Sequence, residues 1–206
     1  MKRLMKDPLN LIVVGVAGQG NVVISLLISD ALVREGYLVT FGQTYGVTQR
    51  GGSVMNYIRI SKEIQYSPII PDGGADIILG LEPVEAMRML GQYGNPNVIT
   101  VFNPRPIFSE DITSFFGVEY PDVDKLIKAI KGLSDKTLIV NATEEAQELG
   151  NPILANVILV GVLVGLGALP LDENSLEPVL RERFPKMIDL NMRAFNKGME
   201  LVKVVA

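Results

Sequence analysis

The feature that most constrains this fold is a glycine loop, Gly15–Gly20 (Gly-Val-Ala-Gly-Gln-Gly), set between two apolar segments. The run Leu9–Val14 before it is apolar at every position except Asn10, which is typical of a buried parallel strand. The segment Asn21–Arg34 after it has a long apolar helical pattern. The order strand, glycine turn, helix is how an α/β domain presents backbone N–H groups to an anion at a helix N-terminus.

Strand-like and helix-like segments alternate along the rest of the chain. Strands are expected at 37–41, 53–60, 65–70, 75–80, 98–102 and 137–140, and helices at 83–90, 122–131, after 141, 175–184 and 186–204. Residues 53–60 and 65–70 are expected to pair as an antiparallel hairpin at a sheet edge, because Pro68 and Pro71 close the second segment. The pattern predicts an α/β fold: a three-layer, Rossmann-like sandwich with a mainly parallel sheet, an edge hairpin and a helical C-terminal region. We expect one domain over residues 1–206.

The stretch Asn151–Leu171 contains no charged residue. Its length permits a membrane span, and Gly161 and Gly165 have the spacing that suits close helix packing. Prolines bracket the stretch and amphipathic helices follow it, which favours a helix in the core or at a subunit interface. A membrane-tethered adaptor is the weaker alternative.

Composition removes several kinds of chemistry from this chain. It has neither cysteine nor histidine, which excludes thiolate catalysis, cysteine-held iron–sulfur clusters, Ser-His-Asp triads and histidine metal sites. We therefore expect no catalytic residue and no metal site here. The net charge of −4 gives no basic footprint for nucleic acid. No signal-peptide cleavage site follows the basic N-terminus, so we expect a cytoplasmic protein.

The first glycine loop departs from a dinucleotide-binding fingerprint in two ways. Ala17 stands where the pattern Gly-x-Gly-x-x-Gly has its middle glycine, and residues 42–44 offer no carboxylate for a ribose. A stand-alone nucleotide-binding reductase or sensor is thus one alternative function. A tight turn that binds nothing is another interpretation of the loop.

A second candidate binding segment is Tyr45–Ser53, in which Arg50 precedes Gly51 and Gly52. Backbone N–H groups can converge there beside a guanidinium, which suits a carboxylate or a phosphate. A surface hairpin with a solvated Arg50 is the alternative.

Two more candidates follow strands at their carboxyl ends, where ligands bind open α/β sheets. Glu82 could instead counter a helix dipole, and Asn103 could lie in an ordinary turn. The full set of candidate binding residues is Gly15, Gly18, Gln19, Gly20, Tyr45, Arg50, Gly51, Gly52, Ser53, Glu82 and Asn103.

Taken together, these motifs resemble a known family. The loop Gly15–Gly20 and the segments 44–54, 67–71 and 81–86 are similar to the gamma subunit or domain of 2-oxoacid:ferredoxin oxidoreductases. The sequence Thr-Gln-Arg-Gly-Gly-Ser-Val at 48–54 is most similar to the beta subunit of indolepyruvate ferredoxin oxidoreductase. The resemblance covers nearly the whole chain. Ala17 departs from it, because the family's loop usually has glycine there and a methyl group takes space that a phosphate would approach.

The resemblance implies an accessory subunit. Enzymes of this family decarboxylate a 2-oxoacid on thiamine diphosphate, pass electrons through iron–sulfur clusters to ferredoxin, and transfer the acyl group to coenzyme A. This chain has no cysteine for clusters and no Gly-Asp-Gly…Asn-Asn pattern for magnesium and thiamine diphosphate. Those cofactors are therefore expected on a larger partner subunit, through which this chain would serve ferredoxin indirectly.

The same resemblance gives the candidate residues a role at the subunit junction. The glycine segments would line a pocket for the 2-oxoacid and coenzyme A, and Arg50 would pair with a carboxylate or with the coenzyme A phosphates. The apolar segments 21–34 and 151–171 are the expected contact surfaces for the partner. The isolated chain is expected to be inactive, and neither nucleic acid nor a membrane is an expected partner.

Overall fold

The computed structural model describes residues 2–45, 52–107 and 119–205. One mixed six-stranded sheet has the order β2-β3-β1-β4-β5-β6. Its strands are β1 Leu9–Val16, β2 Leu38–Tyr45, β3 Ser53–Ser61, β4 Ile77–Gly80, β5 Ile99–Phe102 and β6 Lys136–Ile139. The helices are α1 Asn21–Arg34, α2 Pro83–Tyr93, α4 Val123–Leu133, α5 Ala142–Glu148, α6 Ala155–Gly165, α7 Glu173–Arg183 and α8 Ile188–Val205, with a 3₁₀ turn η1 Pro152–Leu154 before α6.

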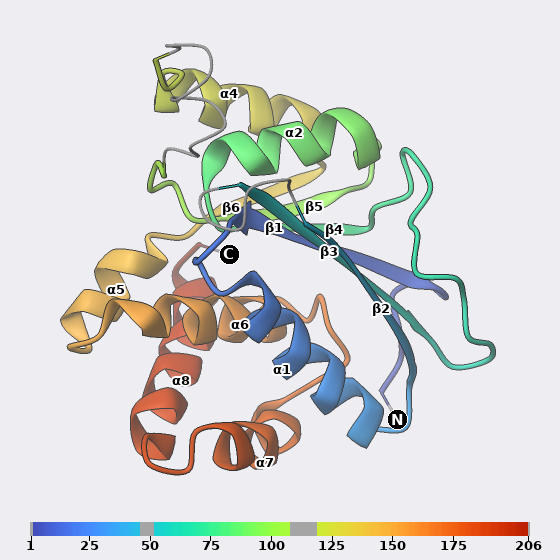
Figure 1. Ribbon diagram of the computed structural model, residues 1–206, viewed down its shortest axis with the longest axis vertical. Coiled ribbons are helices and arrows are strands. Elements are labelled where there is room, and N and C mark those ends of the chain that lie inside the picture. The colour runs from blue at the N-terminus through green and yellow to red at the C-terminus, as the bar shows by residue number, and fades with distance from the viewer. Residues whose placement is uncertain (1, 46–51, 108–118, 206) are drawn as a thin grey trace.

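The predicted three-layer α/β sandwich is confirmed. Strands β1, β4, β5 and β6 run parallel to their neighbours in this order. Helices α2 and α4 cover one face of the sheet, and α1 and α6 cover the other (Figure 1). The central strands β1 and β4 are buried along their whole length, which explains why their sequences are apolar apart from Asn10 and the glycines. The helical C-terminal region is also present, as α7 and α8.

The antiparallel edge contains the predicted strand at 53–60, as β3, but its hairpin partner is β2 and not residues 65–70. Strand β3 pairs antiparallel with β1 on one side and with β2 on the other, so β2 is the edge strand. Residues 65–70, the expected hairpin partner, form no strand. Arg59 holds them as a loop, since its Nη1 donates to the carbonyl oxygens of Ser67 and Ile69 at 3.0 and 3.1 Å. Pro68 also lacks the N–H group that a strand ladder needs.

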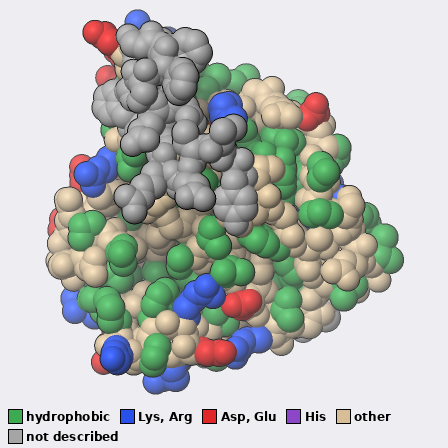
Figure 2. Space-filling view, in the orientation of Figure 1, with side chains coloured by type: hydrophobic (Ala, Val, Ile, Leu, Met, Phe, Trp, Pro, Cys, Tyr) green, Lys and Arg blue, Asp and Glu red, His purple; other side chains and the backbone are tan. Residues whose placement is uncertain are grey.

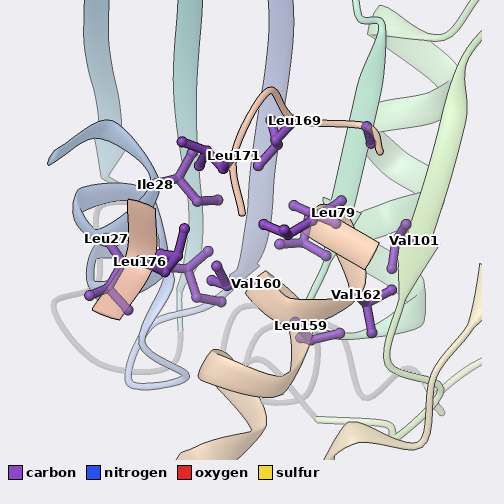
Figure 3. Close-up of a cluster of buried hydrophobic side chains, with 14 of the residues drawn as sticks. Leu27, Ile28, Leu79, Val101, Leu159, Val160, Val162, Leu169, Leu171 and Leu176 are labelled. Atoms are coloured by element: carbon purple, nitrogen blue, oxygen red, sulfur yellow. The ribbon is translucent and has the colours of Figure 1, made fainter. Parts of the chain in front are cut away.

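The larger core cluster lies between the sheet and the α1/α6 layer. Figure 3 shows Leu159, Val160 and Val162 of α6 among side chains of α1, the sheet and the segment after α6. Residues 157–164 of α6 are all buried. Residues 157–164 therefore belong to the chain's own core, as the core-helix alternative predicts, and the expectation that these eight residues form a partner surface is wrong. No helix in the described ranges is long and apolar enough to cross a membrane.

Glycines allow α6 and α8 to approach closely, as the spacing of Gly161 and Gly165 predicts. A Cβ atom at Gly161 would lie 2.1 Å from the carbonyl oxygen of Phe195. A Cβ atom at Gly198, on the opposing helix, would lie 2.0 Å from the carbonyl oxygen of Ile158. Both obstacles are helix backbone, so neither can move without separating the two helices.

Gly161→Ala is expected to lower the free energy of unfolding by about 2–3 kcal/mol, because overpacking forces the backbones of α6 and α8 apart. Urea unfolding followed by circular dichroism measures this change.

Gly91→Ala is the matched control. Gly91 is an exposed residue within α2, and a Cβ atom there would meet nothing within 4 Å. This change should leave stability unaltered or raise it by up to about 1 kcal/mol, since alanine favours a helix. A Gly161→Ala protein as stable as Gly91→Ala would contradict the close packing of α6 on α8.

Candidate functional site

The structure places Gly52 and Ser53, the end of the second candidate segment, beside the first glycine loop at the carboxyl end of β1. Because β3 runs antiparallel to β1, its first residue, Ser53, pairs with Val16, the last residue of β1. Just beyond this pair, the N–H of Ala17 donates to the carbonyl oxygen of Gly52 at 2.8 Å. Gly52 and Ser53 thus lie directly beside the loop Gly15–Gly20, although more than 30 residues separate them from it in sequence.

Not every predicted site residue can be placed. Arg50, Gly51 and the side chain of Tyr45 lie outside the described part of the structure. We call residues 15–20 the first glycine segment, and Gly52 with Ser53 the described part of the second.

The first glycine segment has a backbone that requires glycine. Gly18 and Gly20 have φ angles of +99° and +88°, in the left-handed region. A Cβ atom at Gly15 would come within 2.8 Å of three neighbouring side-chain atoms. At Gly18, by contrast, a Cβ atom would meet no atom of the described residues within 4 Å, and Gly18 is exposed.

Gln19 is bonded within the chain at both ends of its amide. Its Oε1 accepts from the N–H of Val16 at 2.6 Å, and its Nε2 donates to the carbonyl oxygen of Leu81 at 2.9 Å. This side chain therefore ties the end of β1 to the segment that follows β4. The bond to Leu81 engages one of the two N–H donors of Nε2.

Helix α1 begins without a side-chain cap. Its N-cap is Gly20, and its first turn contains no acidic residue. Such a terminus leaves backbone N–H groups and the positive end of the helix dipole for an anion. Asn156 of α6, which the sequence analysis does not identify, packs against it: a Cβ atom at Gly20 would lie 2.1 Å from its Nδ2. Nothing local in the sequence connects two residues this far apart in the chain.

Glu82 lies at the N-terminus of α2 and is only 1 % exposed. Its Oε1 accepts from the N–H of Glu85, and its Oε2 accepts from the hydroxyl of Tyr120 at 2.6 Å. Glu82 is thus the N-cap of α2, in line with the helix-terminus alternative. Burial raises the pKa of its carboxyl, while the bonds from Tyr120 and from the Glu85 and Val84 N–H groups lower it in part. Tyr120 is a second residue that the sequence analysis missed.

Asn103 lies at the end of β5 and is 5 % exposed. Its Nδ2 donates to the hydroxyl of Thr143 on α5 at 2.8 Å. It borders a hollow of about 350 Å³, whose described lining comes from the ends of β5 and β6 and from α5. Asn103 therefore belongs to the same sheet edge as the glycine segments but faces a hollow of its own.

Charge on the face of the molecule seen in Figure 2 is mixed. Figure 2 shows acidic and basic side chains interspersed on the viewed face, with hydrophobic side chains between them. Within residues 2–45, 52–107 and 119–205, no group of three or more Asp or Glu side chains could hold a metal ion.

The pH dependence of stability tests the environment of Glu82. Burial raises the pKa of the Glu82 carboxyl in the folded protein above its ordinary value of 4.5. The contribution of Glu82 to the free energy of unfolding is therefore fully present below pH 4.5 and is lost as pH rises through the raised pKa. Glu82→Gln should remove this loss, so urea unfolding between pH 4 and 7 should show the variant gaining stability relative to the wild type.

Tyr120→Phe should act in the opposite sense. It removes a hydrogen bond that lowers the pKa of Glu82, so the folded-state pKa should rise further. The loss of stability with rising pH should therefore continue to a higher pH than in the wild type. Parallel stability curves for all three proteins would contradict the buried, Tyr120-bonded carboxylate.

Comparison with known proteins places these features in a family. The family model for pyruvate ferredoxin/flavodoxin oxidoreductase matches residues 10–201. The indolepyruvate oxidoreductase subunit IorB of Archaeoglobus fulgidus is 37 % identical over 191 residues, which cover 92 % of this chain and 93 % of that protein. The IorB subunit of Thermococcus kodakarensis is 36 % identical over 196 residues, covering 94 % and 96 %.

Solved structures share the fold at lower identity. The gamma subunit of a keto/oxoacid ferredoxin oxidoreductase from Geobacter sulfurreducens has a TM-score of 0.68 and 20 % identity, covering 95 % of this chain and 99 % of that one. A 2-oxoglutarate:ferredoxin oxidoreductase chain from Magnetococcus marinus has a TM-score of 0.73 and 22 % identity; the match covers 98 % of this chain but 32 % of that one. The chain belongs to the pyruvate ferredoxin/flavodoxin oxidoreductase family, as a small subunit of the 2-oxoacid:ferredoxin oxidoreductase type.

Proposed function

We propose that this chain is the small subunit of an oxidoreductase that acts on an aryl 2-oxoacid of the indolepyruvate kind. It would help to form the pocket for the oxoacid and coenzyme A beside a larger subunit, for oxidative decarboxylation to the acyl-coenzyme A. The observation that carries the proposal is the contact between the two glycine segments, Ala17 N–H to Gly52 oxygen, at the edge of the sheet where α/β folds bind ligands. Similarity to IorB subunits over more than nine-tenths of the chain supports the choice of substrate class.

The described residues suit an anionic group at this edge. The first turn of α1 has no side-chain cap and no acidic residue, and Gly18 adjoins open space. Backbone N–H groups of this turn would hold a carboxylate or a phosphate of coenzyme A, which accepts the acyl group in the overall reaction. Arg50, two residues before Gly52 in the sequence, would add a cationic side chain to bind the same anionic group.

The remaining parts of the reaction belong to the partner in this proposal. The chain has no cysteine for iron–sulfur clusters and no Gly-Asp-Gly…Asn-Asn pattern for magnesium and thiamine diphosphate. These cofactors would therefore reside on the larger subunit, which would pass electrons to ferredoxin. The chain alone would be inactive. We place the complex in the cytoplasm.

Co-purification and assay test this function. The tagged chain should recover a larger subunit that contains iron and thiamine. The complex should reduce ferredoxin with indolepyruvate or phenylpyruvate only when coenzyme A is present. Recovery of the chain as a monomer, or a complex that oxidises pyruvate or 2-oxoglutarate in preference to aryl oxoacids, would contradict the proposal.

Gly18→Asn tests whether the first glycine segment faces the shared pocket. Asparagine tolerates the left-handed backbone better than other side chains, so the fold should persist. Its side chain would fill open space at the tip of the loop. We expect kcat/KM of the reconstituted complex to fall by about tenfold or more.

Gly150→Asn is the matched control. Gly150 follows α5, has a φ angle of +91°, and a Cβ atom there also meets nothing within 4 Å. Its complex should keep wild-type activity. Equal activity of both variants would mean that Gly18 does not face the site.

A further inference from the structure

The start of α2 is bonded to both glycine segments. The carbonyl oxygen of Leu81 accepts from Nε2 of Gln19 at 2.9 Å, which ties it to the first segment. The carboxylate of Glu85, in the first turn of α2, accepts from the hydroxyl of Ser53 at 2.5 Å, which ties it to the second. A single short stretch of chain, residues 81–85, therefore contacts both segments.

The hydroxyl of Ser53 both donates a hydrogen bond to α2 and accepts one from it. Its one hydrogen goes to Oε2 of Glu85, and its oxygen accepts from Nη2 of Arg88. A serine hydroxyl has a single hydrogen to donate. Ser53 consequently has no donor left for a ligand, although its position beside the first glycine segment makes it a candidate.

Glu85 has an unusual setting for a charged residue. Its side chain is 5 % exposed, while that of its partner Arg88 is 51 % exposed. Burial of a carboxylate is costly unless the group is paired and hydrogen-bonded. Arg88 supplies Nε and Nη2 at 3.1 and 2.6 Å, and Ser53 supplies its hydroxyl. An apolar side chain could fill this space without the free-energy cost of removing a carboxylate from water. The presence of a buried charged residue here therefore indicates a role other than packing.

Directed bonds at this point hold the end of a sheet ladder. Ser53 is the first residue of β3 and pairs with the last residue of β1. The next contact outward is the hydrogen bond from Ala17 N–H to the oxygen of Gly52. The end of a strand separates readily from its neighbour when only the backbone hydrogen bonds of the sheet hold it. At this end the hydroxyl of Ser53 also donates to the carboxylate of Glu85 on α2, which adds a second attachment.

We propose that Glu85, through Ser53, is a positioning residue of the site: the α2 carboxylate sets the placement of Gly52 against Ala17. This inference builds on the proposed function, because it assigns Ser53 to the support of the pocket and not to its lining. A displacement of about 1 Å at a binding segment can reduce the rate by orders of magnitude.

Amide hydrogen exchange on the full-length chain tests the positioning without reference to activity. In Ser53→Ala, exchange at Ala17 N–H should accelerate by about tenfold or more relative to the wild type. Exchange at Val140 N–H, which bonds to the oxygen of Phe102 at the far side of the sheet, should not change. Ser53→Thr keeps the hydroxyl and should restore slow exchange at Ala17.

The same variants in the reconstituted complex test the consequence for the site. Ser53→Ala should raise KM for the oxoacid or coenzyme A by about tenfold with a smaller change in kcat, and Ser53→Thr should rescue it. Arg181→Met, which breaks an exposed Arg–Glu pair on α7, is the control for loss of a helix ion pair and should match the wild type. Glu85→Gln keeps an acceptor for Ser53 and should fall between wild type and Ser53→Ala.

The outcomes separate this inference from the proposed function. Unchanged Ala17 exchange in Ser53→Ala would overturn the positioning role whatever the enzyme does. Unchanged KM, or failure of Ser53→Thr to rescue, would overturn it as well. A wild-type complex with no activity on any 2-oxoacid would refute the proposed function. Exchange at Ala17 N–H in Ser53→Ala and in Glu85→Gln would still decide whether the bond between Ser53 and Glu85 positions Gly52.

Discussion

The antiparallel pairing of β3 with β1 is the constraint on which the site depends. In a wholly parallel sheet, the start of β3 would lie at the opposite edge from the end of β1. Because β3 is reversed, Ser53 meets Val16, and Gly52 meets Ala17 one step further. Two segments far apart in sequence thereby become one surface at the carboxyl edge, where the parallel strands β1, β4 and β5 also end.

Glycine serves two different purposes in this chain. At Gly161 and Gly198 the missing side chain lets two helix backbones touch, so that α8 covers α6 and completes the core. At Gly18 the missing side chain leaves the tip of a left-handed turn open. Gly161 and Gly198 are buried, whereas Gly18 is exposed. The positions of glycines in a sequence therefore do not by themselves distinguish a packing role from a binding role.

Much of the architecture follows from local sequence. The mostly apolar run of β1 predicts a buried strand, and β1 is buried along its whole length between β3 and β4. Helix α1 follows its glycine turn as the pattern predicts. The hairpin partner is mispredicted because residues 65–70 have a β-forming composition, while the decisive contacts come from Arg59. The uncharged stretch suits a partner interface as well as a core helix, and only the position of α8 decides between them.

The site is less accessible to sequence reasoning than the fold. The motifs that the resemblance rests on mark the right region, but they do not reveal that the Gln19 amide is bonded within the chain or that Glu82 is a helix cap. Tyr120 and Asn156 reach the site from distant segments, and no spacing rule links them to it. Side-chain bonding, which decides which groups remain for a ligand, depends on these long-range contacts.

The central claim is that the glycine edge of the sheet faces the larger subunit. Hydrogen exchange of this chain with and without that subunit measures it most directly, peptide by peptide. We expect new protection in peptides that cover residues 15–20 and 52–56, with little change along α7. Protection confined to α7 and α8, with the glycine edge unchanged, would contradict the account.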